Sequence, residues 1–243
     1  MSRNPAARAS PYDAITSLYD CWSRSVVEDV PFYVTEARRS GCPVLELAVG
    51  TGRIAIPIAE AGIAVIGVDS SEEMLAACRE RALGRGVEEL VDLRFGDLAD
   101  PPVSESVPLV ICPFRSFLHL RDDDARRHAL RSAHDLLVPG GRLVFDVFTP
   151  KRDDIAETHG RWLEREPGIF ERAYWDTRAR TLTLSVCDEA AEATLELAWR
   201  SPGEWRTLLK DAGFAVEACY GWFDRTPYEG GEDTVWIASR QSV

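Results

Sequence analysis

The segment 43–62, PVLELAVGTGRIAIPIAEAG, constrains the fold of this 243-residue chain more than any other. A short apolar run is followed by a turn with Gly50 and Gly52, and then by apolar residues at helical spacing. This order predicts a strand, a tight turn and a helix, the unit with which nucleotide-binding α/β folds begin. A dinucleotide-binding G-x-G-x-x-G turn needs glycine at 48, 50 and 53, but the chain has Ala48 and Arg53. The turn is therefore a poor match to a pyrophosphate-binding turn.

The same alternation of strand and helix continues to residue 148. Apolar runs predict strands at 44–49, 63–69, 91–97, 107–114 and 142–148. Helical spacing fills the intervals, at about 52–60, after Ser71 and at 122–137, which predicts parallel β-α units. Two last strands, 214–223 and 233–239, would form a hairpin that completes the sheet. We therefore expect an α/β fold with a doubly wound, mostly parallel seven-stranded sheet.

A different pattern interrupts this alternation between residues 161 and 200. The segment 181–187 alternates strictly between apolar and hydroxyl side chains, and the segments on either side of it alternate as well. Such alternation predicts a small antiparallel sheet with one face in water. We expect one domain, 1–243, with four parts and a flexible lead of about ten residues. The parts are an N-terminal helical segment (12–41), a core (42–150), an antiparallel insertion (160–200) and a C-terminal helix and hairpin (201–240).

The composition narrows the classes of protein. The formal net charge of −12 argues against nucleic-acid binding, which needs clustered Lys and Arg. The pairs Arg38-Arg39 and Arg126-Arg127 are interpreted as solvated helix faces, and the run 122–124 as a helix start rather than a metal site. Six cysteines without a C-x-x-C pair predict small buried residues in a reducing cytoplasm. Neither a membrane span nor a signal peptide is expected.

Three carboxylates lie where predicted strands end. In an open α/β sheet, ligands bind beyond the carboxyl ends of the strands. Glu46 lies inside an apolar strand and needs a cationic or strongly hydrogen-bonding partner. Asp69 could accept both hydroxyls of a ribose, and Asp97 either an exocyclic amine or a backbone N–H in a capping role. So many carboxylates disfavour a pyrophosphate and favour a cofactor with a positive centre and an ammonium group.

Four segments in order carry a resemblance to a known family: VLELAVGTGR, VIGVDSSEEML, LRFGDL and LLVPGGRLVFDVF. They resemble the class I S-adenosylmethionine-dependent methyltransferases, over roughly residues 12–240. The family pattern E-x-G-x-G-x-G is matched by Glu46, Ala48, Gly50 and Gly52, with Ala48 as a mild departure. A second departure is Pro108, where the family usually has an aspartate before the core of the fourth strand.

The resemblance implies S-adenosylmethionine as cofactor and no metal. It places the glycine turn against the methionine part, Asp69 on the ribose, Ser70 and Met74 beside the adenine, and Asp97-Leu98 at the adenine edge. The implied cofactor contacts are Tyr19, Glu46, Ala48, Gly50, Thr51, Gly52, Arg53, Asp69, Ser70, Met74, Asp97, Leu98, Cys112 and Pro113.

The N-terminal segment and the insertion resemble one subgroup, the amino-sugar N,N-dimethyltransferases and glycine N-methyltransferase. The resemblance implies an N-terminal lid over the cofactor, an insertion over the substrate, and methyl transfer to a small-molecule N or O nucleophile. The candidate substrate contacts are Trp22, Phe114, Arg115 and His119, and Trp22 and Arg24 are weaker candidates for cofactor contacts. His119 is either the general base or scaffolding.

Two other classes of function stay open on the sequence. A non-catalytic S-adenosylmethionine-binding module would use the same pocket as a sensor. An NAD-dependent oxidoreductase is disfavoured by Ala48 and Arg53. Either a monomer or a homodimer is expected, since the insertion offers edge strands.

Overall fold

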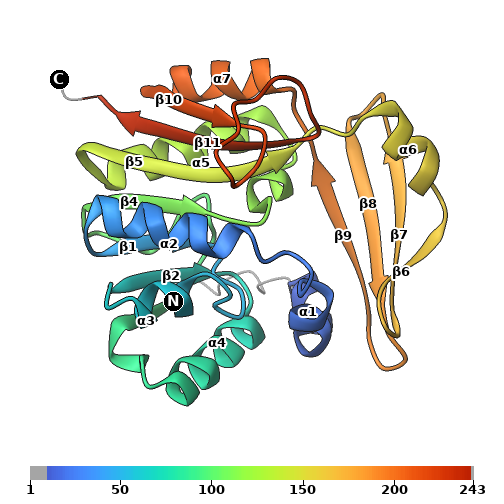
Figure 1. Ribbon diagram of the computed structural model, residues 1–243, viewed down its shortest axis with the longest axis horizontal. Helices are drawn as coiled ribbons and strands as arrows, with labels where there is room; N and C mark the ends of the chain where they lie inside the picture. Colours follow the sequence, from blue (N-terminus) through green and yellow to red (C-terminus); the bar gives the residue numbers. More distant parts are fainter. Residues whose placement is uncertain (1–9, 242–243) are drawn as a thin grey trace, which may run out of the picture.

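A seven-stranded sheet forms the centre of the molecule (Figure 1). The computed structural model describes residues 10–241, and most of the lead segment lies outside them. The strand order is β10-β11-β5-β4-β1-β2-β3, and β11 runs antiparallel to both of its neighbours, β5 and β10. The strands are β1 Val44–Leu47, β2 Val65–Asp69, β3 Val91–Phe95, β4 Val107–Cys112, β5 Leu137–Phe148, β10 Phe214–Tyr220 and β11 Asp233–Arg240. The doubly wound, mostly parallel sheet and its closing hairpin are confirmed.

Helices cover both faces of this sheet. The helical elements are η1 Pro11–Ile15, α1 Thr16–Trp22, α2 Asp29–Ser40, α3 Ala55–Glu60, α4 Glu72–Arg85, η2 Glu88–Leu90, η3 Ser116–His119, α5 Asp123–Leu136, α6 Arg152–Thr158 and α7 Pro202–Asp211. Successive residues of β5 point to opposite faces, as in any strand. Val144 therefore packs in a core cluster with α2, α3 and α4, and Phe145 in another with α5 and α7.

Short polar caps fix where the helices start. The Ser71 hydroxyl accepts a hydrogen bond from the Met74 N–H, and the Asp122 carboxylate accepts one from the Ala125 N–H. Ser201 forms a capping box with Glu204 at the start of α7. These caps agree with the sequence predictions for the same helices.

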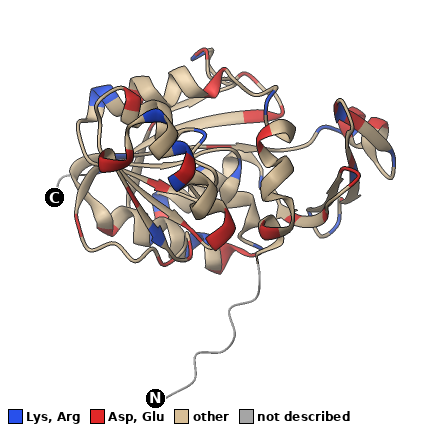
Figure 2. Cartoon of the chain, turned by 90° about the horizontal axis from the view of Figure 1, so that it is seen from below, with Lys and Arg blue, Asp and Glu red and all other residues tan. Residues whose placement is uncertain are grey.

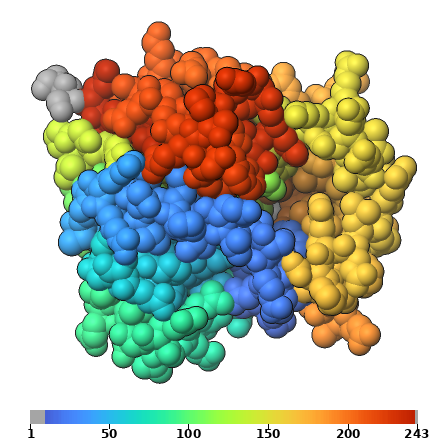
Figure 3. Space-filling model, in the orientation of Figure 1, coloured from blue at the N-terminus to red at the C-terminus, as the bar shows by residue number. Residues whose placement is uncertain are grey.

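The insertion is a separate four-stranded antiparallel sheet, β6-β7-β8-β9. Its strands are β6 Trp162–Glu166, β7 Ile169–Asp176, β8 Thr181–Cys187 and β9 Glu192–Ala198. Leu182, Leu184 and Val186 are buried against the main domain, as their alternation predicts. Figure 3 shows the N-terminal segment, in blue, lying between the core and the insertion, in yellow. The insertion and the N-terminal segment therefore border the carboxyl ends of the parallel strands.

Element boundaries differ from the sequence predictions at several points. β5 begins at Leu137 rather than 142, because the Pro139–Gly141 segment continues the strand instead of forming a separate turn. Strand pairing between β4 and β5 is irregular between Val107 and Leu109. Pro108 lies there, and a residue without a backbone N–H is tolerated at such an irregularity. α6 was not predicted.

Two interpretations of side-chain burial, for Arg126 and for the cysteines, differ from the structure. Arg126 is fully buried rather than solvated, because its guanidinium donates to the Ala198 carbonyl and pairs with Asp123. All six cysteines lie within residues 10–241 and are free thiols, but only Cys78 and Cys112 are buried, while Cys42 is exposed.

Acidic and basic residues are interspersed along the chain in the cartoon of Figure 2. In the part of the chain that the structure describes, no helix is long and apolar enough to cross a membrane. Nor do three or more His, Cys, Asp or Glu side chains converge as possible metal ligands among residues 10–241.

Candidate active site

The turn after β1 has a backbone that side chains rarely adopt. Gly50 and Gly52 have φ angles of 55° and 81°, and Ala48 has a φ of 58°. A Cβ on Gly52 would lie 2.5 Å from the Cys78 sulfur and 3.0 Å from Ile56. Glycine at 52 is therefore required both by backbone conformation and by close packing on α4.

Asp69, at the end of β2, holds this turn. Its Oδ2 accepts a hydrogen bond of 2.8 Å from the Gly50 N–H, and its Oδ1 accepts one of 2.9 Å from the Ser71 N–H. Burial raises the pKa of Asp69, although these backbone hydrogen bonds oppose the rise. The carboxylate therefore ties the glycine turn to the start of α4, and it also lines the cavity described next.

A cavity of about 200 Å³ lies at the carboxyl ends of β1, β2 and β4. A second cavity, of about 170 Å³, shares Ala48, Asp69, Ser70, Leu98 and His119 with it and adds Asp97 and Leu120. The two together form one continuous binding region beside the glycine turn. The first is lined by Ser10, Pro11, Tyr12, Tyr19, Ala48, Gly50, Asp69, Ser70, Met74, Leu98, Phe114, Ser116 and His119.

Glu46 is buried behind the turn, with only 2% of its surface exposed. Its Oε2 has no hydrogen-bond partner among the residues that the structure describes. The cationic partner expected from the sequence is not Arg53, whose guanidinium binds Asp29 with two hydrogen bonds of 2.8 and 2.5 Å. Burial raises the pKa of Glu46, and Arg53 opposes this only in part. An ammonium group of a ligand would supply the missing partner.

The N-terminal segment is fastened over the turn by polar side chains. The Thr51 hydroxyl donates to Asp20 at 2.6 Å, and Asp20 also pairs with Arg81 of α4. The Ser71 hydroxyl donates to Asp13 at 2.5 Å. These contacts hold η1 and α1 against the carboxyl end of the sheet.

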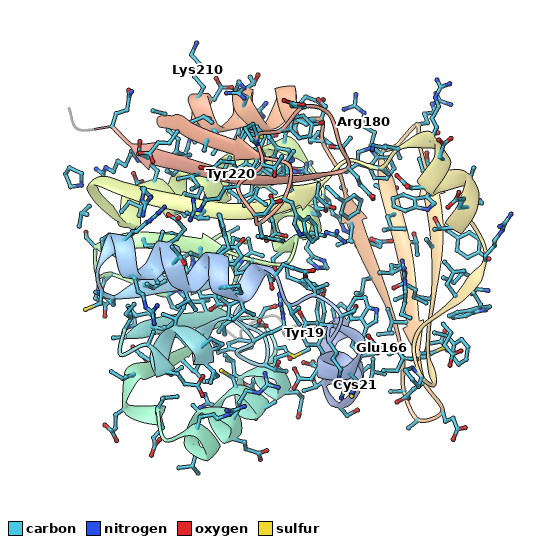
Figure 4. All side chains as sticks on the ribbon, viewed as in Figure 1. Tyr19, Cys21, Glu166, Arg180, Lys210 and Tyr220 are labelled. Atoms are coloured by element: carbon cyan, nitrogen blue, oxygen red, sulfur yellow. The ribbon has the colours of Figure 1, made fainter. Side chains whose placement is uncertain are left out.

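Aromatic rings close the cavity on this side. Tyr19, on α1 (Figure 4), lies edge-to-face with Tyr12, Trp22 and Phe114, with ring centroids 5.8, 6.0 and 6.2 Å apart. A Cβ on Gly50 would lie 4.0 Å from the Tyr19 ring, so Tyr19 covers the glycine turn directly. The Trp22 indole N–H donates to Glu171 of β7 at 3.1 Å, which links α1 to the insertion.

His119 lies at the cavity wall, at the end of η3. Its Nε2 is 2.9 Å from the Tyr12 hydroxyl, and the two rings pack edge-to-face. Burial lowers the pKa of His119 to about 4, because the charged imidazolium is poorly solvated there. The imidazole is therefore neutral at pH 7 and is hydrogen-bonded.

Asp97 and Arg115 are engaged with neighbours. The Asp97 Oδ1 accepts a hydrogen bond of 2.8 Å from the Ala99 N–H, while the residue still borders the second cavity. Arg115 pairs with Asp233 at 2.7 Å and lies over the Phe148 ring. Arg115 thus faces a separate cavity of about 30 Å³ and not the one that holds His119.

The site residues predicted from the sequence fall into two groups, according to whether they line the two cavities. Those lining the two cavities are Tyr19, Ala48, Gly50, Asp69, Ser70, Met74, Asp97, Leu98, Phe114 and His119. Those that lie behind or beside the walls are Trp22, Glu46, Thr51, Gly52, Arg53, Cys112, Pro113 and Arg115. Sequence reasoning missed Tyr12, although it lies seven residues before Tyr19 and such spacing puts two side chains on one helix face. It also missed Asp20 and Ser116, for which no pattern was available.

The aromatic residues of the insertion do not line the cavity. Trp162 and Tyr174 are each 43% exposed, and the Arg172 guanidinium lies over both rings. Trp175 packs against Trp199, with ring centroids 5.6 Å apart.

The fold and this site together define a Rossmann-like methyltransferase. The glycine turn, Asp69 after β2 and the unpartnered, buried Glu46 suit a nucleoside that carries a positive charge, not a pyrophosphate. These residues therefore fit S-adenosylmethionine.

Comparisons with known proteins agree with a methyltransferase fold and site. Residues 44–141 match a family model described as a methyltransferase domain. An uncharacterized methyltransferase of Geobacillus kaustophilus is 31% identical over 175 residues, covering 70% of this chain and 79% of that protein. Rat (Rattus norvegicus) glycine N-methyltransferase is 35% identical over 183 residues, covering 70% of this chain and 60% of that protein. The structure of the CcbJ methyltransferase from Streptomyces caelestis superposes with a TM-score of 0.83 at 26% identity, covering 96% of this chain and 99% of that one.

The chain belongs to the S-adenosylmethionine-dependent methyltransferases. It is therefore a transferase.

The close packing of Gly52 predicts a specific cost of substitution. Gly52 and Gly62 both have a φ of 81°, but a Cβ on Gly62 would have nothing within 4 Å. Gly62→Ala should lower the free energy of unfolding by about 1–2 kcal/mol from backbone strain. Gly52→Ala should lower it by about 3 kcal/mol or more, because the clash with Cys78 adds to the same strain.

Urea denaturation of both variants measures this difference, and calorimetry measures the loss of S-adenosylhomocysteine binding expected for Gly52→Ala alone. Equal unfolding free energies for the two variants would contradict the packing argument.

Proposed function

We propose that this enzyme transfers the methyl group of S-adenosylmethionine to a small-molecule nucleophile, and that the acceptor is an amine. The aromatic side chains Tyr12, Tyr19 and Phe114 at the cavity of about 200 Å³ support a small acceptor that docks beside the cofactor. The similarity to glycine N-methyltransferase supports a small amine.

The residues around the cavity suggest how the cofactor is held. Glu46 would accept a hydrogen bond from its ammonium group, since the Oε2 otherwise stays buried without a partner. Asp69 would accept from the ribose hydroxyls, and Ser70, Met74, Asp97 and Leu98 would flank the adenine. The turn of Ala48, Gly50, Thr51 and Gly52 would lie along the methionine part, with Tyr19 above it. Arg53, Cys112 and Pro113 would support this arrangement from behind.

The cofactor supplies a methyl group on a positively charged sulfur, ready for in-line displacement. Because no covalent enzyme intermediate is needed, the protein contributes mainly orientation and exclusion of water. The edge-to-face rings of Tyr12, Tyr19, Trp22 and Phe114 provide an apolar wall for this purpose. Trp22, Phe114 and Arg115 are proposed as substrate contacts: Phe114 lines the cavity itself, while Trp22 and Arg115 lie beside it.

His119 is proposed as the base that removes a proton from the acceptor. Its pKa of about 4 leaves it neutral at pH 7 but makes it a weak base. A neutral amine attacks through its lone pair and loses its proton only after the methyl transfer, so it needs no strong base. A hydroxyl acceptor would need a stronger base, which is why the proposal favours nitrogen over oxygen.

Segments 12–41 and 160–200 are proposed as the lid over the cofactor and the cover of the substrate. The hydrogen bond from Trp22 to Glu171 joins the two, and Asp20 with Thr51 joins the lid to the glycine turn. Such a double attachment supports a role in closing the site.

The proposal is tested by a panel of small primary and secondary amines, hydroxy acids and phenols. The readout is release of S-adenosylhomocysteine. We expect turnover with amines and none above background with hydroxy acids. Turnover restricted to phenols or hydroxy acids would overturn the choice of nitrogen. Absence of turnover across the panel would count against a small-molecule acceptor.

A second prediction concerns His119. His119→Ala should lower kcat by about 10²-fold, the lower end of what a general base contributes. S-adenosylhomocysteine affinity should change much less. Tyr12→Phe is the matched control, because it keeps the ring and removes only the hydroxyl that contacts His119. Unchanged kcat in His119→Ala would show that the histidine is scaffolding.

A further inference from the structure

Two consecutive residues after β4 adopt a left-handed backbone although neither is glycine. Phe114 has a φ of 57° and Arg115 a φ of 64°. Side chains disfavour this region, so two such residues in a row persist only where the surroundings hold them. The turn that they form leads from β4 into η3, which carries His119.

The support comes from one carboxylate on the neighbouring strand. Asp146 of β5 accepts a hydrogen bond of 2.8 Å from the Phe114 N–H at Oδ1 and one of 3.0 Å from the Arg115 N–H at Oδ2. The Tyr33 hydroxyl of α2 donates to the same carboxylate at 2.7 Å. Asp146 is only 7% exposed, so water does not substitute easily for these donors.

The turn sets the position of an aromatic wall. The Phe114 ring lines the cofactor cavity and also the cavity of about 30 Å³ that Asp146 borders. The centroid of the Phe114 ring lies 6.2 Å from that of the Tyr19 ring. The Arg53 guanidinium lies over the Phe114 ring, 4.7 Å from its centroid. A change in the turn would therefore move a wall that faces the cofactor.

We propose that Asp146 is a positioning residue for cofactor binding and methyl transfer. Through the two backbone N–H groups, its carboxylate holds the Phe114–Arg115 turn and thereby keeps the Phe114 ring against the cofactor cavity. Asp146 does not line the cavity of about 200 Å³ itself. This role extends beyond the proposed function, because it concerns the cofactor and does not depend on the acceptor.

The charge of Asp146 makes this role dependent on pH. Burial raises the pKa of Asp146 to about 6, and the Tyr33 hydrogen bond opposes the rise. The groups that face or influence it are Tyr33 and Asp29 of α2, Arg53 after β1, Cys112 of β4, Arg115 of the turn and Asp233 of β11. Above pH 6 the carboxylate is ionised and its bonds to the N–H groups are charge-assisted. Below pH 6 protonation weakens them and loosens the turn.

The test is the affinity for S-adenosylhomocysteine between pH 5 and pH 8, measured by calorimetry on the full chain. Asp146→Asn places an amide NH₂ against one of the two backbone N–H groups. It should weaken binding at pH 7 by about tenfold or more, the effect of losing a hydrogen bond to a charged group. It should also remove the fall in affinity around pH 6 that the wild type shows.

Tyr33→Phe gives a second, independent result. It removes the hydroxyl that lowers the pKa of Asp146, so the fall in affinity should move to higher pH. Desolvation also raises the pKa of Asp69, which lines the cavity, and of Glu46 behind it, but neither bonds Tyr33, so Tyr33→Phe leaves both in place. Tyr174→Phe is the control, because Tyr174 lies on β7 of the insertion with 43% of its surface exposed and lines neither of the cavities that Phe114 borders; it should leave the profile unchanged.

The outcomes are decisive in each case. Wild-type affinity and an unchanged pH profile in Asp146→Asn would overturn the proposal. If Asp146→Asn does not fold, an unmoved profile in Tyr33→Phe would overturn it. Failure of every acceptor in the amine panel would remove the proposed substrate class but leave these binding measurements intact.

Discussion

The structure of the site depends on the hydrogen bond between the Asp69 carboxylate and the Gly50 N–H. This bond of 2.8 Å joins the end of β2 to the turn after β1, and the same carboxylate holds Ser71 at the start of α4. Ser71 in turn donates to Asp13 of the N-terminal segment. One carboxylate therefore orders the glycine turn, the next helix and the segment above them. Because two backbone N–H groups already donate to the Asp69 carboxylate, the position of this carboxylate is fixed before a ligand binds.

Charge decides which ligand the turn suits. Glu46 is buried and Asp69 is partly buried, and desolvation raises the pKa of each. A pyrophosphate would raise both pKa values further, whereas an ammonium and a sulfonium would stabilise the ionised carboxylates. Tyr12, Tyr19 and Phe114 present aromatic rings to the same cavity. Together these features explain how a turn without the first and third glycines of a dinucleotide-binding sequence can still hold a nucleoside.

Much of the fold follows from local patterns in the sequence. The 2-residue and 3.6-residue periodicities located the parallel core, the antiparallel insertion and the closing hairpin, because burial on one or both faces fixes these periods. Local patterns did not predict the β4–β5 pairing around Pro108 or the start of β5 at Leu137, because pairing between strands determines both. Arg126 was misread because its partner, the Ala198 carbonyl, is distant in sequence.

Only part of the site could be predicted, because local patterns locate strand ends but not contacts between residues that are distant in sequence. Residues at strand ends, such as Asp69, can be found from the order of the elements alone. Tyr12, Asp20 and Asp146 act through contacts with residues far along the chain, to His119, Arg81 and Phe114 respectively. Position in the sequence does not reveal such contacts.

The most direct test of the account is a calorimetric titration of the wild type and Asp69→Ala with S-adenosylhomocysteine and, separately, with NAD. The account predicts one S-adenosylhomocysteine bound per chain, loss of that binding in Asp69→Ala, and no binding of NAD. Binding of NAD by the wild type, or undiminished S-adenosylhomocysteine binding by Asp69→Ala, would contradict it.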